Sequence, residues 1–179
     1  MQLLPVIYAN DGIKTPEHCR DCGGVCCQRY PGIAWPSDFG PRETLAMTIA
    51  SYLETSRWSV DSWEGDPREE ALGFQHDQLH RVYYVRPATV EGRGKVRDDS
   101  WGGPCIHWIS DHGCSLAFFN RPYECRHLAG APFVNGERKC EYDNGIGKRQ
   151  SVMEWIPFQD EVIAAMEFVE AKHAANINT

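Results

Sequence analysis

The spacing of apolar residues predicts an amphipathic helix over residues 42–53. Leu45, Ile49 and Leu53 recur at every fourth position, and side chains with this spacing share one face of a helix. Candidates for the N-cap and the first turn stand immediately before it: Ser37, Asp38 and Pro41. We therefore expect this helix to bury one apolar stripe in the core.

A second helical pattern begins at Ser151 and runs toward the C-terminus. Ser151 and Glu154 have the spacing of a capping box, and Pro157 predicts either a kink or a restart of the helix. The expected buried stripe consists of Phe158, Val162, Met166 and Val169. This segment is therefore predicted to close over the core.

The segments between these helices change to a pattern typical of β-structure. Residues 80–86 are rich in β-forming side chains and predict a strand. Residues 104–116 alternate around an Asp-His-Gly turn and predict a short β-hairpin with Cys105 in one arm and Cys114 in the other. In contrast, residues 55–80 are polar and interrupted, which predicts an insertion or a long loop.

Composition fits one globular domain over residues 1–179. The hydrophobic fraction of 42% and the charged fraction of 24% are ordinary for a globular protein of this length. A net charge of −7 argues against a general affinity for nucleic acid. No segment approaches the roughly 20 apolar residues of a membrane span. Because the N-terminus lacks a basic region and Pro5 interrupts its apolar run, we expect a cytoplasmic protein without a membrane anchor.

Four thiols stand within nine residues near the N-terminus: Cys19, Cys22, Cys26 and Cys27. Cysteines separated by two residues can turn both sulfurs toward one ion, and the glycines at 23 and 24 permit a tight turn. In a reducing compartment, cysteines at this density indicate metal ligands more than disulfides. Since neighbouring side chains point apart, one of the adjacent cysteines ligates while the other packs, or each serves a different centre.

Further thiols come much later in the chain. The predicted hairpin carries Cys105 and Cys114, and Pro122 begins a short helix that delivers Cys125. Cys140 follows a predicted turn and is the candidate ligand tied least closely to this arrangement. Eight thiols allow one four-thiolate centre with spare cysteines or two such centres. We therefore expect a small α+β domain in which cysteine loops, a short β-hairpin and a few packing helices are stabilised by metal.

The two groups of cysteines together resemble a known pattern. Cys19-x2-Cys22-x3-Cys26-Cys27 is followed by Pro104-Cys105, by Gly113-Cys114-Ser115, and by Arg121-Pro122-Tyr123-Glu124-Cys125-Arg126. This order resembles the YkgJ-like cysteine-cluster family, the CxxCxxxCC proteins described as zinc- or iron-chelating domains. The resemblance covers the metal framework at residues 19–40 and 101–130 and implies metal binding in a small cytoplasmic domain.

The resemblance leaves the metal and the activity open. A similar motif occurs in flagellin lysine N-methylases, where an iron–sulfur cluster is implicated, although this chain shows no glycine-rich methyl-donor motif. Spacing alone suits zinc or a [4Fe–4S] cluster; the adjacent cysteines and the methylase motif favour the cluster. Three hypotheses follow: a redox or protein- or peptide-modifying protein with an iron–sulfur cluster, a zinc-stabilised module that binds a protein or peptide partner, and a metal chaperone or buffer. No motif names a reaction, so whether the protein is an enzyme stays open.

Two arginines flank the last of these thiols. Arg121 and Arg126 are expected to neutralise a negatively charged thiolate centre or to donate hydrogen bonds to its sulfurs, and the alternative is an ordinary ion pair, for example with Glu124. Four histidines lie within two residues of a cysteine and are alternative ligands, although for each the non-ligand interpretation is preferred: His18, His107, His112 and His127.

Overall fold

A computed structural model describes residues 24–68, 80–100, 102–110, 113–127, 133–134, 137–138 and 146–177. The helices are α2 (Val25–Arg29), α3 (Arg42–Glu54), α5 (Tyr123–His127), α6 (Ile146–Met153) and α7 (Gln159–Ile177), with 3-10 helices η1 (Pro36–Phe39), η2 (Phe118–Asn120) and η4 (Ile156–Phe158). The strands are β1 (Trp58–Glu64), β2 (Arg81–Pro87), β3 (Trp108–Ile109), β4 (Gly113–Cys114), β5 (Phe133–Val134) and β6 (Glu137–Arg138). This mixture confirms the predicted α+β class.

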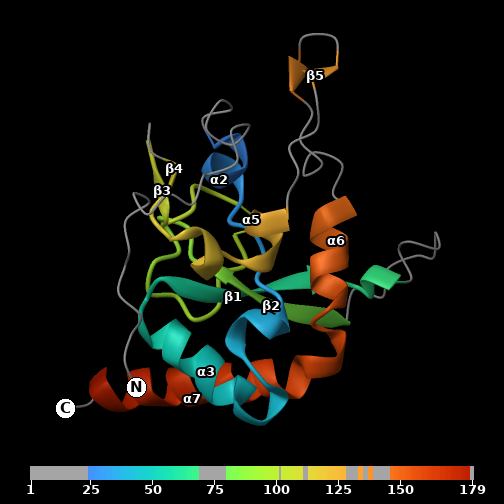
Figure 1. The fold of residues 1–179 in the computed structure, drawn as a ribbon. Coiled ribbons are helices and arrows are strands. Elements are labelled where there is room, and N and C mark those ends of the chain that lie inside the picture. The colour runs from blue at the N-terminus through green and yellow to red at the C-terminus, as the bar shows by residue number, and fades with distance from the viewer. Residues whose placement is uncertain are drawn as a thin grey trace.

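Strands β1 and β2 form an antiparallel two-stranded sheet through the middle of the molecule (Figure 1). Asp61 pairs with Tyr84 at its centre, and Trp58 pairs with Pro87 at one end. Helices α3 and α7 lie on one side of the sheet, whereas α2, α5 and the hairpin β3–β4 lie on the other (Figure 1). The sheet therefore separates a helical layer from a layer that carries the five described cysteines.

The prediction of an insertion or long loop over residues 55–80 is wrong for its first part. Residues 58–64 form β1, which pairs along its whole length with β2. Strand β2 confirms the strand predicted at 80–86. The pattern concealed β1 because polar side chains are buried along it: Ser59, Asp61 and Ser62 are at most 2% exposed. Residues 69–79 of this range lie outside the described residues.

A buried ion-pair network explains how β1 tolerates these polar residues. Arg86 on β2 donates from Nε to Asp61 Oδ2 at 2.8 Å, and from Nη2 to Asp98 Oδ2 at 3.1 Å and to the Asp98 carbonyl at 2.9 Å. The Thr89 hydroxyl also donates to Asp98 Oδ2, at 3.1 Å. The side chains of Arg86, Asp61 and Asp98 are only 3%, 2% and 2% exposed. The ion pairs and hydrogen bonds of the network therefore replace the contacts with water that these charges lose on burial.

Helix α3 matches the predicted helix closely. Leu45, Ile49 and Leu53 are at most 2% exposed and form the expected stripe against the core. The expected N-cap is wrong, because the residue at this position is Pro41 and no side chain caps the helix. Asp38 instead belongs to the separate turn η1, where its carboxylate accepts a hydrogen bond from the backbone nitrogen of Trp35 at 3.0 Å.

The C-terminal segment is helical as predicted, but it begins earlier. Ser151 lies inside α6 and does not form a capping box; its hydroxyl accepts a hydrogen bond from Trp35 Nε1 at 3.1 Å. Pro157 restarts the helix, since it lies in η4 between α6 and α7. Three positions of the expected stripe, Val162, Met166 and Val169, are fully buried, while Phe158 is partly buried against the same core.

The core joins the helical layer to the sheet. Trp155 is fully buried, and its Nε1 donates to the carbonyl of Ala34 at 2.7 Å. Gln159 at the start of α7 bonds to both backbone groups of Tyr83, which fastens α7 to β2. Among the described residues, no helix combines the length and the apolar character needed to cross a membrane.

Candidate metal centre

The structure brings together four predicted site thiols from four separate segments: Cys27 in α2, Cys105 before β3, Cys114 in β4 and Cys125 in α5. The backbone nitrogen of Cys105 donates to the carbonyl of Cys27 at 2.7 Å. Trp108 bonds to the carbonyl of Cys105 at 2.9 Å and pairs with Cys114 across the hairpin. The negative charges that Cys27, Cys105 and Cys114 acquire on ionisation act directly on Cys125. The four sulfurs therefore share one electrostatic environment.

The hairpin predicted to carry two of these thiols is shorter than expected. Strands β3 and β4 have two residues each, so Cys114 lies in the hairpin but Cys105 lies outside it. Cys105 instead forms an isolated antiparallel bridge with Thr89, and Ile106 bonds to the carbonyl of Ala88 at 3.0 Å. The end of β2, rather than the turn of the hairpin, therefore positions Cys105.

Burial makes three thiols of this group, Cys105, Cys114 and Cys125, hard to ionise. Burial raises the pKa of Cys105 to about 12. It also raises the pKa of Cys125 well above its usual value, and the charges of Cys27, Cys105, Glu124 and Cys114 raise it further. Thiolates gathered in this way need a nearby positive charge, because each one disfavours the ionisation of its neighbours.

Arg121 supplies positive charge beside one of these thiols. It is 7% exposed, and its Nε donates to the carbonyl of Leu116 at 3.1 Å. Burial raises the pKa of Cys114, but the charge of Arg121 and a hydrogen bond from it act in the opposite direction. Arg121 therefore lies next to the sulfur of Cys114.

Arg126 has a different partner. Its Nη2 forms an ion pair with Asp38 Oδ1 rather than with Glu124, and the other carboxylate oxygen of Asp38 accepts the backbone nitrogen of Tyr123 at 2.7 Å. The ring of Tyr123 stacks on Trp35 with centroids 3.6 Å apart. Asp38 therefore anchors both ends of the helix that carries Cys125. Sequence reasoning missed this role because the partners are more than 80 residues apart.

Glu124 is a second residue that the sequence did not single out as part of the site. It is 4% exposed, and its Oε2 accepts the backbone nitrogen of Ile33 in a short hydrogen bond, while Oε1 has no partner among the described residues. Burial raises the pKa of Glu124 to about 7, although the bond from Ile33 and the charge of Lys148 oppose the shift. The carboxyl thus fastens α5 to the segment after α2.

Two glycines allow the chain to pack closely around the thiols. A Cβ atom at Gly32 would lie 2.3 Å from the sulfur of Cys125. Gly24 has φ +72° next to α2, and a Cβ there would lie 3.0 Å from Trp108 Nε1 and 3.8 Å from the Cβ of Cys27. A side chain at either position would therefore displace a thiol or the indole beside it.

His107 is the described alternative ligand nearest to these thiols in the chain. Its Nδ1 lies 3.1 Å from the Ser115 hydroxyl and 3.4 Å from Arg57 Nη2, and its buried Nε2 has no partner among the described residues. Burial, together with the charge of Arg57, lowers the pKa of His107 to about 4, so its imidazole is neutral near pH 7. His18 and His112 lie outside the described residues, as does the side chain of His127.

The remaining predicted ligands are not among the four thiols that the structure brings together. Cys26 lies beside Cys27 in α2 and is half-buried, whereas Cys19, Cys22 and Cys140 lie outside the described residues. Within the part of the chain that is described, no three His, Cys, Asp or Glu side chains are grouped closely enough to hold one metal ion. The described thiols are neighbours without being assembled as ligands of a single ion.

Comparisons with protein-family models, with curated proteins and with solved structures found no match to this chain.

Proposed function

We propose that this protein binds a metal centre through Cys27, Cys105, Cys114 and Cys125, with further thiols supplied by the Cys19–Cys22 loop. The observation that carries the proposal is the gathering of four thiols from four segments into one buried region. Thiols that only filled space would not need to share one electrostatic environment, whereas ligands of a common centre must.

The electrostatics of the region support a cationic occupant. The charges of Cys27, Cys105 and Cys114 raise the pKa of Cys125, and that of Cys114 raises the pKa of Cys105. A bound metal ion reverses this effect because it stabilises the deprotonated sulfur. Arg121 compensates charge only at Cys114. Arg86 acts only on Cys105 among the thiols whose pKa is raised by burial, so a bound metal would add a positive charge common to the whole group.

We favour an iron–sulfur cluster over zinc as the occupant. Thiolate sulfur suits both, but the adjacent Cys26 and Cys27 and the likeness to the methylase motif point to a cluster. Membership of the YkgJ-like family and a cytoplasmic location are part of the same proposal. When bound, such a cluster supplies one-electron redox chemistry or a Lewis-acidic iron for the modification of a protein or peptide.

The chain's own residues have defined parts in this arrangement. The Asp38–Arg126 pair and the bond from Ile33 to Glu124 hold α5, and with it Cys125, against the segment after α2. Arg121 stabilises the thiolate form of Cys114. These contacts fix two of the thiols before a metal arrives, which lowers the conformational cost of binding.

Metal analysis and a visible spectrum of protein purified without air test the proposal. We expect brown protein that contains iron and acid-labile sulfide and that bleaches on reduction. Replacement of Cys27, Cys105, Cys114 or Cys125 by Ser should remove most of the iron, whereas Cys140→Ser, at the least closely tied position, serves as the matched comparison and should retain it.

Other results would redirect or refute the proposal. Colourless protein with stoichiometric zinc that unfolds on chelation would identify a zinc-stabilised interaction module, and rapidly exchanging metal on a folded apoprotein would identify a chaperone or buffer. Protein that binds neither iron nor zinc, or in which Cys27→Ser and Cys125→Ser keep the full metal content, would show that the thiols do not form a centre.

A further inference from the structure

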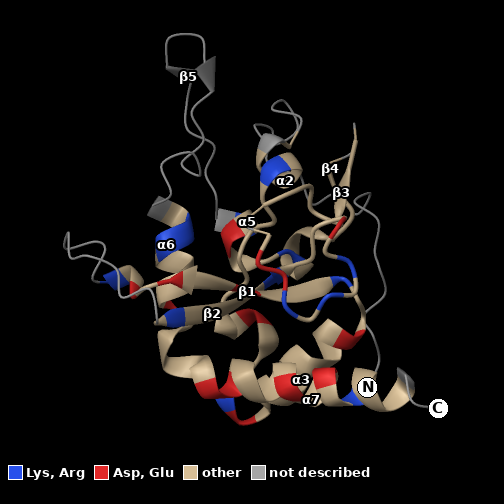
Figure 2. Cartoon of the chain, turned by 180° about the vertical axis from the view of Figure 1, so that it is seen from behind, with Lys and Arg blue, Asp and Glu red and all other residues tan. Residues whose placement is uncertain are grey.

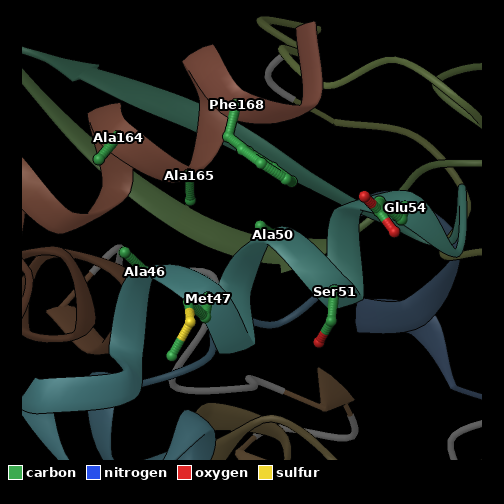
Figure 3. Close-up of a pocket in the computed structure, with 8 residues that line it drawn as sticks. All are labelled: Ala46, Met47, Ala50, Ser51, Glu54, Ala164, Ala165 and Phe168. Atoms are coloured by element: carbon green, nitrogen blue, oxygen red, sulfur yellow. The ribbon is translucent and has the colours of Figure 1, made fainter. Parts of the chain in front are cut away.

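An apolar groove runs between α3 and α7, on the side of the sheet opposite the thiols. It has a volume of about 470 Å³ and is lined by Ala46, Met47, Ala50, Ser51, Glu54, Ala164, Ala165 and Phe168. Figure 3 shows Phe168 reaching from α7 toward α3, with the alanines between the two helices. The groove has no connection with the proposed metal centre, so it raises a separate question of function.

The groove is lined by small side chains and by two large, exposed apolar ones. Its floor is made of small side chains, whereas Met47 and Phe168 beside it are 69% and 60% exposed. Large exposed apolar side chains that line one groove from both of its helices favour a binding surface over an ordinary solvated face. The floor also shows why the hollow exists: the alanines leave space where larger side chains would have filled it.

The length of the groove matches two turns of helix. Ala46, Ala50 and Glu54 lie on successive turns of α3, so they span about 12 Å along its axis. A bound helix that presents apolar side chains at i, i+4 and i+7 places them over about 10.5 Å, and this is the usual spacing of anchors in helix-in-groove recognition. The groove therefore fits an amphipathic helix.

The charges around the groove are mostly negative (Figure 2). Helices α3 and α7 together carry six acidic residues, Glu43, Glu54, Asp160, Glu161, Glu167 and Glu170, and two basic ones, Arg42 and Lys172. Both basic residues are already paired, Arg42 with Glu161 at 2.5 Å and Lys172 with Glu54 at 2.7 Å. Among the described residues, no ion pair involves Glu43 or Glu167, which lie one turn before Met47 and next to Phe168.

This charge selects among occupants. A second copy of the chain would bring the same excess of acidic residues against the first, which is unfavourable. The apolar N-terminal stretch of residues 1–8 contains Pro5 and no Lys or Arg, so it offers neither a helix nor complementary charge. We propose that the α3–α7 groove binds an amphipathic helix of a partner protein, with apolar anchors on the floor and Lys or Arg residues against Glu43 and Glu167.

A displayed library of helical peptides, each about 15 residues long so that helix formation is feasible, tests the proposal with the full-length chain as bait. We expect selection to enrich peptides with large apolar residues at i, i+4 and i+7 and with flanking Lys or Arg. Phe168→Ala should weaken their binding by about tenfold or more, as truncation of an anchoring aromatic does. Phe119→Ala is the matched control and should have no effect, because Phe119 lies in η2, away from the groove, and is 69% exposed against 60% for Phe168.

A charge-reversed variant separates the electrostatic part of the proposal from simple apolar adhesion. Glu43→Lys combined with Glu167→Lys should weaken the enriched peptides and strengthen their Lys-to-Glu counterparts. Failure to enrich any helix, enrichment of acidic helices, or binding that persists in Phe168→Ala would overturn the proposal. A concentration-dependent dimer of the chain that Phe168→Ala dissolves would assign the groove to a second copy and overturn it as well.

Discussion

Replacement of Arg86 by Met should destabilise the protein more than any other change of one charged residue in the described sheet. The guanidinium of Arg86 makes ion pairs to Asp61 at 2.8 Å and to Asp98 at 3.1 Å, and donates to the carbonyls of Pro87 and Asp98 at 3.1 and 2.9 Å. All three charged side chains are at most 3% exposed. Met fills a similar volume but removes the cation that forms ion pairs with both buried carboxylates.

The expected loss follows from the burial of these carboxylates. Removal of one partner of a buried ion pair costs about 3–5 kcal/mol, because the charge left behind has neither water nor a counter-ion. A domain of this size has a free energy of unfolding of about 5–15 kcal/mol, so the variant keeps only part of its stability. Neutralising the carboxylates as well, with Asp61→Asn and Asp98→Asn, should recover more than half of the loss.

The pH dependence of stability should change in the same variant. Burial raises the pKa of Asp98, but hydrogen bonds from Ser100, Arg86 and Thr89 and the charge of Arg86 outweigh it, so the pKa lies below its usual value. In the wild type, the unfolded state therefore takes up the proton first, and stability falls as the pH drops below about 4. Without Arg86, burial dominates at Asp98, so the native Asp98 carboxylate takes up a proton more readily than the unfolded one and the variant should gain stability as the pH falls from 7 toward 4.

Urea denaturation followed by circular dichroism measures both effects. The matched control is Arg81→Met on the same strand, where the arginine is 42% exposed and pairs with Glu64 at 3.5 Å; its loss should be within about 1 kcal/mol. If Arg86→Met and Arg81→Met lowered the free energy of unfolding equally, the network would not stabilise the sheet. The reasoning about uncompensated charge would also be refuted if the additional Asn substitutions restored nothing.

Two other substitutions give distinct readouts. Gly32→Ala should lower the bound metal measured by elemental analysis, because its Cβ would lie 2.3 Å from the sulfur of Cys125. Gly40→Ala strains the backbone at φ +96°, but its Cβ would meet nothing within 4 Å, so it should lower stability and leave the metal content of the folded protein unchanged. An equal loss of metal in both would contradict this explanation. Burial, together with the charge and hydrogen bonding of Asp61, raises the pKa of Tyr84 well above its usual value, so the native state keeps a proton that the unfolded state loses above about pH 10. Tyr84→Phe should therefore remove part of the decline in thermal stability at alkaline pH. Near neutral pH it should cost about 1 kcal/mol, because the hydrogen bond of the hydroxyl is lost. An unchanged alkaline decline would show that this hydroxyl does not cause it.

The helical layer of the fold was accessible from the sequence, and β1 was not. The stripe formed by Leu45, Ile49 and Leu53 is a local pattern, and burial of one helix face follows from it directly. Strand β1 lacks a corresponding pattern because Asp61 is buried together with its neighbours. Its polarity is tolerated only because Arg86 lies opposite in the folded chain, and no local rule anticipates that pairing.

The site shows the same division between local and distant information. Cysteine spacing identified thiols that the fold brings together, since a short motif is visible in the chain itself. Asp38 and Glu124 were not identified, because their roles depend on contacts with segments 85 and 91 residues away, respectively. A carboxylate that fastens a helix resembles a solvated one until the fold shows what it touches.

The buried network and the thiol group are physically connected, which gives the sheet a part in the proposed metal centre. Thr89 donates to Asp98 and forms the bridge to Cys105, and the charge of Arg86 lowers the pKa of Cys105 against the larger effect of burial. The variant with Arg86→Met, Asp61→Asn and Asp98→Asn should therefore regain stability and still bind metal more weakly than the wild type, because it lacks this cation near the thiol. Chelator competition on anaerobically prepared protein measures the difference. Wild-type affinity in that variant would mean that Arg86 acts only on the sheet, through its ion pairs.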